Sequence, residues 1–292
     1  MRFATLELDG KVVPVLVSTD GNGWAAVPEW LGADFDGDMA DLIGRCPQPT
    51  GHAAPTAWRP LDGLRLRAPL VPRRNVFCVG KNYHEHAAEF ARSGFDTSAA
   101  KGETAPAAPV VFTKAPSTVV GPGDEVLPFT ELTRQLDYEA ELAVVIGKPG
   151  RGIRPEDAWN HVWGYTIVND VTARDLQQKH RQWFIGKSMD TFCPMGPWIV
   201  TADELDATDL PVKCWINDEL RQDANTRDLI FDIPTIIATL SAGMTLQPGD
   251  VIATGTPAGV GIGFSPPRFL APGDRMRIEI GGIGVLENRI AG

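Results

Sequence analysis

The sequence predicts a mixed α/β fold that is rich in β-structure, with a rolled or barrel-like sheet and helices at its periphery. Short runs of β-branched and aromatic residues recur along the chain, and glycine and proline separate them, which is typical of strands joined by turns. Helical stretches are few. A doubly wound parallel sheet is therefore not favoured, because it needs a helix between successive strands. With 292 residues, the chain is long enough for one large domain or for two.

Residues 1–70 are predicted to form a small α+β domain of their own. Arg2–Leu8 and Lys11–Val17 are apolar runs joined by an Asp-Gly pair, the pattern of a hairpin with a two-residue turn. The stretch Cys46–Pro60 contains four prolines, which favours a linker. We therefore expect residues 71–292 to form a second, catalytic domain.

The second domain is predicted to consist mainly of strands. Each strand is an apolar run that ends at a glycine or a polar residue. Helices are expected in short stretches, two of which open with a proline or an aspartate. In chain order, we expect strands at Asn75–Gly80, Val110–Thr113, Asp137–Gly147, Trp163–Val168, Val251–Ala253, Arg275–Ile280 and Gly284–Arg289, and helices at Lys81–Phe90, Pro155–Trp159, Ala173–Gln178 and Asp232–Ser241.

Two other segments are predicted to be loops. Ala91–Pro109 is small, polar and rich in alanine and proline, which favours a mobile loop that can close over a site. Gly186–Asp190 is expected to be a loop that carries a lone lysine, Lys187.

The strand Asp137–Gly147 is the centre of the functional prediction. Side chains alternate faces along a strand, so Glu139 and Glu141 point the same way. The run Trp163–Val168 ends just before Asp170, which joins the glutamates if the two strands pair. Three carboxylates without a soft ligand suit Mg²⁺ or Mn²⁺. The alternative is that the glutamates line the solvated face of an edge strand.

A histidine and a carboxylate form a second candidate pair. On a helix His86 and Glu89 are neighbours, three residues apart. A carboxylate beside an imidazole holds its tautomer and makes it a better base. The alternatives are an incidental pair on a surface helix, or metal ligation by His84 and His86.

Charge and cysteine content exclude several classes of protein. The net charge of −10 argues against nucleic acid or an anionic membrane as a partner. The four cysteines include no CxxC pair, so zinc-finger and thioredoxin-like sites are excluded. No basic leader opens the sequence, and no apolar run reaches membrane-spanning length. We therefore expect a cytoplasmic protein with reduced thiols.

Six motifs follow one another along the chain: Cys78–Tyr83, Phe112–Ser117, Asp137–Leu142, Asn169–Asp175, Gly186–Asp190 and Thr254–Pro257. In this order they resemble those of the fumarylacetoacetate hydrolase superfamily, in particular bacterial members of the acylpyruvate hydrolase and 2-hydroxyhepta-2,4-diene-1,7-dioate isomerase type. The resemblance covers the chain from about Asn75 to Ile290, and Lys81 stands where many members have arginine.

The resemblance implies a β-sandwich roll of the fumarylacetoacetate hydrolase type with peripheral helices, preceded here by the small N-terminal domain. It also implies a homodimer that binds Mg²⁺ or Mn²⁺ through Glu139, Glu141 and Asp170. His86 and Glu89 match a dyad that activates water, and Lys187 matches a lysine that faces the substrate. The further substrate contacts implied are Tyr83, Lys114, Arg174, Gln178 and Thr256.

The sequence thus predicts a metal-dependent hydrolase that cleaves a C–C bond in a 2,4-dioxo acid of the acylpyruvate or fumarylpyruvate type, through an enolate that the metal stabilises. The expected substrate is a small anionic 2-oxo acid. Tautomerisation or decarboxylation of oxaloacetate-like 2-oxo diacids, and isomerisation of hydroxymuconate-type dienoates, need the same residues and stay open as alternatives. A structural or binding protein without turnover is disfavoured, because such a site needs no unpaired Lys187 or His86.

Overall fold

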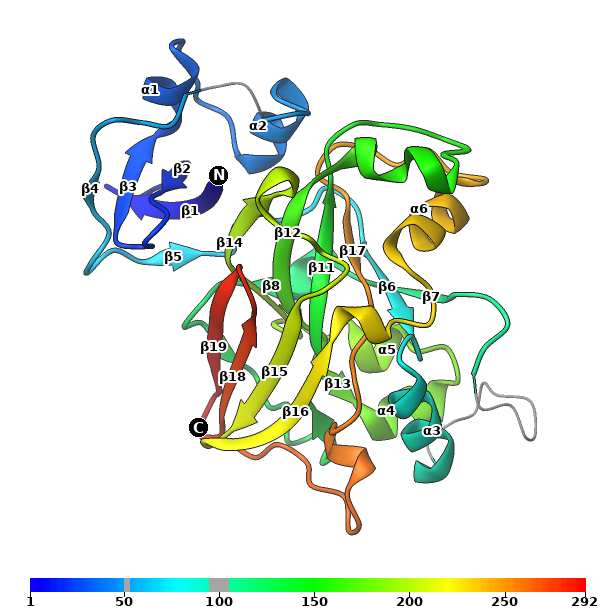
Figure 1. The fold of residues 1–292 in the computed structure, drawn as a ribbon. Coiled ribbons are helices and arrows are strands. Elements are labelled where there is room, and N and C mark those ends of the chain that lie inside the picture. The colour runs from blue at the N-terminus through cyan, green and yellow to red at the C-terminus, as the bar shows by residue number, and fades with distance from the viewer. Residues whose placement is uncertain (50–52, 95–104) are drawn as a thin grey trace.

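The computed structural model describes residues 1–49, 53–94 and 105–292. Within these residues a twelve-stranded sheet runs through the molecule, and a five-stranded sheet packs against its middle (Figure 1). Most neighbouring strands are antiparallel. This arrangement, with helices at the periphery, confirms the β-rich mixed α/β fold predicted from the sequence.

The large sheet combines strands from the N-terminal region with strands from the middle of the chain. Its spatial order is β4 (Arg59–Pro60), β3 (Gly23–Ala26), β2 (Lys11–Val17), β1 (Arg2–Leu8), β14 (Cys193–Thr201), β12 (Val162–Asn169), β11 (Ala140–Ile146), β17 (Val251–Ala253), β6 (Val76–Gly80) and β7 (Val110–Lys114), with β5 (Leu66–Arg67) beside β1 and β8 (Val119–Val120) beside β14.

The second sheet comes mainly from the C-terminal third of the chain. Its order is β16 (Glu219–Asn225), β15 (Pro211–Ile216), β18 (Arg275–Ile280), β19 (Gly284–Ile290) and β9 (Glu125–Val126), and a separate two-stranded pair is formed by β10 (Leu136–Asp137) and β13 (Thr172–Ala173).

The helices are short and lie around the sheets. Among the described residues, no helix has the length and apolar character needed to cross a membrane. Figure 1 shows α3, α4 and α5 gathered near β13 and the end of β6. The helices are α1 (Val27–Leu31), α2 (Met39–Arg45), α3 (His84–Ser93), α4 (Arg174–His180), α5 (Phe184–Lys187) and α6 (Ile233–Ser241), with 3₁₀ turns at Pro116–Thr118, Pro155–His161, Ala202–Glu204, Thr226–Asp228 and Gly261–Gly263.

Strand β11 is buried on both faces, which explains why its sequence is a nearly continuous apolar run. Leu142, Val144 and Ile146 face the core between the two sheets. Ala143 and Val145 face a second core on the other side of the large sheet. Packing on both faces holds β11 in place, and with it the site at the N-terminal end of the strand.

The structure corrects three details of the predicted elements. The strand expected at Asp137–Gly147 is divided into β10 and β11. The N–H groups of Glu139 and Ala140 donate to the side chains of Asn169 and Gln222 instead of to a strand. The segment expected as a loop around Lys187 contains α5, and the helix expected at Pro155–Trp159 is a 3₁₀ turn. Of the loop predicted at Ala91–Pro109, residues 95–104 lie outside the described residues.

The N-terminal 70 residues share a sheet and a core with the rest of the chain. Strand β1 pairs with β14, with Phe3 opposite Ile199. The Phe3 ring contacts Trp30 of α1 and Trp163 of β12, with ring centroids 5.2 and 4.9 Å away. Independent folding of residues 1–70 and 71–292 stays a prediction, and the shared core provides a way to test it.

Phe3→Ala is expected to lower the free energy of unfolding of the whole chain by about 3–5 kcal/mol, because a fully buried phenyl ring is lost from this shared core. Urea denaturation followed by tryptophan fluorescence and circular dichroism measures the change. Val12→Ala, at an exposed position of β2, is the control and should change stability by less than about 0.5 kcal/mol. An effect confined to a separate first transition would show instead that the N-terminal unit unfolds on its own.

Candidate active site

The three carboxylates predicted at the strand ends come together in the structure. β11 and β12 pair with Ala140 opposite Asn169, and the Asp170 N–H donates to the Glu139 carbonyl oxygen at 2.9 Å. One carboxylate oxygen each of Glu139, Glu141 and Asp170, the acidic triad, lies within 4.8 Å of the others, and all three residues are buried. Such a group of oxygens fits a hard divalent cation.

Lys187 and Arg174 pair with carboxylates of the acidic triad. Lys187 Nζ donates to Glu139 Oε2 and to Asp170 Oδ2, both at 2.7 Å. Arg174 Nη2 lies 2.7 Å from Glu139 Oε1. Lys187, which the sequence analysis treated as unpaired, is thus paired with two carboxylates, and its predicted contact with substrate stays a prediction.

Lys114 is fully buried behind Asp170. Its ammonium group donates to Asp170 Oδ1 at 2.6 Å, to the Val171 carbonyl oxygen at 3.1 Å and to the Lys187 carbonyl oxygen. These contacts use all three donors of an ammonium group. In this arrangement Lys114 orients Asp170 and connects β7 to α5. A contact between Lys114 and the substrate stays a prediction.

The two glutamates of the triad have opposite electrostatic environments. Burial acts to raise the pKa of Glu139, but Lys187 and Arg174 outweigh burial and lower this pKa to about 2. Burial raises the pKa of Glu141 well above its usual value, and the charges of Asp170 and Glu139 raise it further. The Glu141 carboxylate accepts a hydrogen bond from the Gly255 N–H at 2.8 Å, and no lysine or arginine is paired with it in the part of the chain that the structure describes. A bound cation would compensate this carboxylate.

This asymmetry predicts a pH-dependent metal affinity. Because the folded-state pKa of Glu141 is raised, the metal-free protein keeps a proton on this carboxyl at pH values above 4.5, its ordinary pKa, and metal binding must displace that proton. Affinity for Mn²⁺ is expected to rise with pH above 4.5, by up to about tenfold per pH unit, until Glu141 is ionised. Calorimetry in buffers of different ionisation enthalpy measures the proton released. In Glu141→Gln the release should disappear; an unchanged release would assign the proton to another group.

His86 and Glu89 lie one turn apart on α3, as predicted. His86 Nδ1 is 3.2 Å from Glu89 Oε2, and Glu89 Oε1 accepts a hydrogen bond from the Gly259 N–H at 3.0 Å. Glu89 is therefore held from two sides. With Nδ1 engaged, Nε2 is the ring nitrogen left for proton transfer.

One narrow cavity brings two members of the acidic triad, Glu139 and Glu141, together with His86 in a single site. Its lining combines aromatic rings with cationic and acidic groups. The residues that line the cavity are Val79, Gly80, Lys81, His86, Phe90, Phe112, Glu139, Glu141, Arg174, Gln177, Trp183, Lys187 and Thr256.

The other predicted substrate contacts differ in their positions. Thr256 lines the cavity and accepts a hydrogen bond from Gln222 at 2.8 Å. Tyr83 is buried and pairs with Leu229 outside the cavity lining. Gln178 is exposed, and its side chain donates to the Gly94 carbonyl oxygen at 3.2 Å. The structure therefore brings Thr256 and Arg174 to the cavity but neither Tyr83 nor Gln178.

Several lining residues were not singled out from the sequence. Gln177, next to Gln178, lies in the cavity wall and accepts from Arg174 Nη1 at 3.2 Å. On a helix both glutamines are neighbours of Arg174, so spacing alone does not decide between them. Trp183 lies against Gly80, where a Cβ atom would be 2.3 Å from the indole ring. This close approach is invisible in the sequence.

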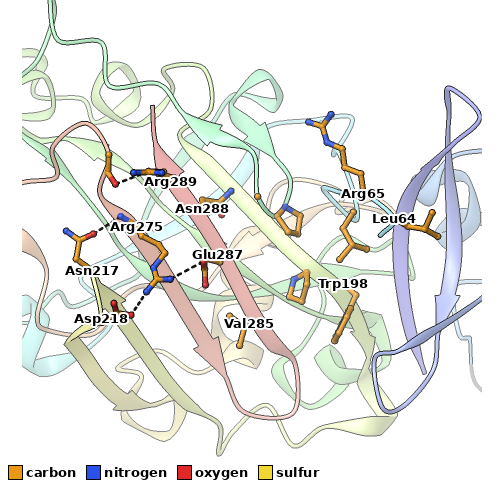
Figure 2. Close-up of a pocket in the computed structure, with 15 residues that line it drawn as sticks. Leu64, Arg65, Trp198, Asn217, Asp218, Arg275, Val285, Glu287, Asn288 and Arg289 are labelled. Carbon is orange, nitrogen blue, oxygen red and sulfur yellow. Dashed lines mark hydrogen bonds and ion pairs between the residues drawn. The ribbon is translucent and has the colours of Figure 1, made fainter. Parts of the chain in front are cut away.

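A larger hollow of about 1210 Å³ lies away from the acidic triad, between the N-terminal unit and β18–β19 (Figure 2). Figure 2 shows Arg275 of this hollow paired with two acidic residues, Asp218 and Glu287. Arg65 contacts Asp124 at 2.7 Å, and Arg289 donates to the Gly273 carbonyl oxygen. The paired charges and the lack of a carboxylate cluster make this hollow a poor candidate for the chemistry.

Comparison with known protein families matches residues 75–291 to the model described as fumarylacetoacetate (FAA) hydrolase C-terminal. This span includes the acidic triad, the His86–Glu89 pair and Lys187. The chain belongs to the fumarylacetoacetate hydrolase family. Membership confirms the resemblance seen in the sequence motifs and the fold that it implied.

Relatives within the fumarylacetoacetate hydrolase family carry different activities. The chain is 53% identical over 232 residues to the oxaloacetate tautomerase of Bacillus subtilis (strain 168), covering 79% of this chain and 74% of that protein. A solved fumarylacetoacetate hydrolase from Exiguobacterium antarcticum has a TM-score of 0.86 and 44% identity, with 100% of this chain and 99% of that chain covered. A solved 2-hydroxyhepta-2,4-diene-1,7-dioate isomerase from Mycobacterium marinum has a TM-score of 0.77 and 33% identity, with 100% and 98% covered.

Proposed function

We propose that this protein is a divalent-metal-dependent enzyme that tautomerises oxaloacetate or a closely related 2-oxo dicarboxylate. The observation that carries the proposal is the 53% identity to an oxaloacetate tautomerase. Tautomerisation was the alternative predicted from the sequence, whereas the leading hypothesis was hydrolysis of a C–C bond. We expect the partner to be a small anionic 2-oxo acid, and the homodimer stays a prediction.

The residues of the site fit Mg²⁺ or Mn²⁺. Glu139, Glu141 and Asp170 would hold the ion, because their oxygens converge and Glu141 is a buried carboxylate paired with no lysine or arginine among the described residues. When bound, the ion supplies a Lewis acid that polarises the 2-oxo group and favours loss of a proton from the neighbouring carbon.

The surrounding side chains account for proton transfer and substrate charge. His86 moves the proton at the carbon next to the 2-oxo group through Nε2, while Glu89 holds Nδ1. Arg174 and Lys187 supply positive charge beside the oxygen where negative charge develops. Phe90, Phe112 and Trp183 exclude water from the cavity. This set of residues performs a keto–enol exchange without any bond to carbon being broken other than C–H.

Hydrolysis of a 2,4-dioxo acid is the second candidate. The His86–Glu89 contact of 3.2 Å favours it, because an imidazole oriented by a carboxylate also activates water. The same triad and the same cations would serve both reactions. An assay is therefore needed to distinguish them.

Purified protein with and without Mg²⁺ or Mn²⁺ should be tested on the enol form of oxaloacetate and on a short acylpyruvate. Tautomerisation appears as metal-dependent loss of the enol absorbance above the buffer background, with no pyruvate or carbon dioxide formed. Release of pyruvate from the acylpyruvate would favour hydrolysis, and release of pyruvate and carbon dioxide from oxaloacetate would favour decarboxylation. If neither compound reacts in the presence of metal, the proposed function is wrong.

A further inference from the structure

Asp137 is a fully buried carboxylate next to the active site, and the mechanism above gives it no role. It lies at the end of β10, two residues before Glu139. Four donors surround it. Its Oδ1 accepts from the N–H groups of Tyr138 at 2.9 Å and Gly261 at 2.6 Å, and its Oδ2 accepts from the Ile262 N–H at 3.1 Å and from Arg174 Nε at 2.9 Å.

One of these four contacts, the one with Arg174, connects Asp137 to the acidic triad. The Arg174 guanidinium is held by Asp137 through Nε, while Nη2 of the same group lies 2.7 Å from Glu139 Oε1. The guanidinium is rigid and planar, so a shift at Nε is passed on to Nη2. Asp137 thereby fixes the position of a cation that orients one of the three carboxylates.

Two of the other contacts, those with Gly261 and Ile262, connect Asp137 to the His86–Glu89 pair. The N–H groups of Gly261 and Ile262 open the 3₁₀ turn Gly261–Gly263, which packs against α3. Gly263 lies so close to Glu89 that a Cβ atom there would be 1.7 Å from Glu89 Oε1. The N–H of Gly259, two residues before the turn, donates to the same Glu89 oxygen at 3.0 Å. Asp137 therefore also fixes the backbone on which Glu89 is seated.

We propose that Asp137 is a positioning residue that couples the acidic triad, through Arg174, to the His86–Glu89 pair, through the turn Gly261–Gly263. The inference rests on the proposed metal-dependent function, because it concerns how the metal ligands and the proton-transfer pair are held in one arrangement. Asp137 itself touches neither metal nor substrate.

The contacts explain why a carboxylate is required. All four neighbours are donors, and an amide has only one acceptor oxygen. In Asp137→Asn at least one donor faces an NH₂ group, which leaves a buried donor unsatisfied. Loss of a partner behind a metal ligand weakens metal affinity by about 10–100-fold in comparable sites.

The test measures both connections without substrate. Asp137→Asn should bind Mn²⁺ about 10–100-fold more weakly by calorimetry, and the electron paramagnetic resonance spectrum of the Mn²⁺-saturated variant should differ from that of the wild type. Amide hydrogen exchange should be faster in both Gly261–Gly263 and α3. Asp175→Asn is the matched control, because Asp175 also accepts from a side chain, the Thr133 hydroxyl, and from the backbone N–H groups of Arg134 and Leu176. The Arg174 guanidinium bonds to Asp137, Gln177 and Glu139 and not to Asp175 among the described residues, so this variant should leave Mn²⁺ affinity and spectrum unchanged.

A second variant separates the two connections. Gly263→Ala displaces Glu89 from the turn, so it should speed exchange in α3 and leave Mn²⁺ affinity at the wild-type value. If Asp137→Asn does not fold, Arg174→Lys replaces it, because a lysine cannot contact Asp137 and Glu139 with the same fork; it should weaken Mn²⁺ binding and keep α3 protected.

The proposed coupling is overturned if Asp137→Asn lowers the melting temperature but keeps the wild-type Mn²⁺ affinity and spectrum. It is also overturned if the Mn²⁺ affinity of this variant falls while the amides of α3 exchange at the wild-type rate. With Arg174→Lys in its place, wild-type Mn²⁺ affinity overturns the proposal. A wild-type protein that binds no Mn²⁺ would overturn the proposed function as well, whereas a failure seen only in the variants overturns this inference alone.

Discussion

Removal of the divalent metal is expected to abolish the activity and to lower the melting temperature of the protein. The activity should be lost because none of the described residues that line the cavity supplies a Lewis acid at the triad. The melting temperature should fall because an ion that binds only the folded state at 100 times its dissociation constant stabilises that state by about 2.7 kcal/mol. Dialysis against a chelator, followed by addition of Mg²⁺ or Mn²⁺, measures both effects. Full activity in the chelated protein would exclude a metal-dependent reaction.

Glu141→Gln is the variant that tests this expectation most directly. Glutamine keeps an acceptor for the Gly255 N–H and removes only the charge. Metal affinity should therefore fall by more than about 100-fold, because mutation of a residue that only hydrogen-bonds to a metal ligand already lowers the affinity by about 10–100-fold. The metal-free variant should be at least as stable as the metal-free wild type, because burial makes the ionised Glu141 unfavourable. Glu279→Gln, at a half-exposed carboxylate of β18, is the matched control.

The acidic triad could be predicted because its signal is local. Glu139 and Glu141 are two residues apart next to an apolar run, and Asp170 follows the partner strand, so one antiparallel pairing brings them together. The surrounding cations could not be placed in the same way. Lys114 and Lys187 are 73 residues apart and meet only because β7 and α5 pack together.

The positions that sequence motifs left undecided depend on packing. Gln177 and Gln178 are equally plausible neighbours of Arg174 on a helix, and the orientation of α4 alone decides which of them reaches the cavity. The role of Asp137 was hidden for a related reason. It belongs to a motif that was assigned to the central strand, but its acceptors serve the turn Gly261–Gly263, more than 120 residues further along the chain.

The choice between tautomerisation and hydrolysis was beyond the sequence motifs, because both reactions need the same triad and the same base. In the structure Glu89 is fixed by both His86 and Gly259, so the pair is preorganised for proton transfer. This geometry fits a base that acts on carbon as well as one that acts on water. The similarity to an oxaloacetate tautomerase favours the first, and the variant that removes the base tests it.

His86→Ala is expected to lower the rate of the catalysed reaction by about 10²–10⁴-fold, the usual contribution of a general base. Mn²⁺ affinity should stay near the wild-type value, because His86 is outside the acidic triad. Glu89→Gln should cause a smaller loss, since it weakens the orientation of the imidazole without removing it. The rates must be measured above the buffer-catalysed background, which sets the lowest detectable activity for oxaloacetate.

His84→Ala is the matched control for this variant. His84 lies at the start of the same helix, is exposed and is absent from the cavity lining, so its loss should leave the rate within about twofold of the wild type, a free-energy difference below about 0.5 kcal/mol. Wild-type activity in His86→Ala would exclude this histidine as the base. Loss of Mn²⁺ binding together with activity would instead make His86 a metal ligand through Nε2, the ring nitrogen that the contact between Nδ1 and Glu89 leaves available.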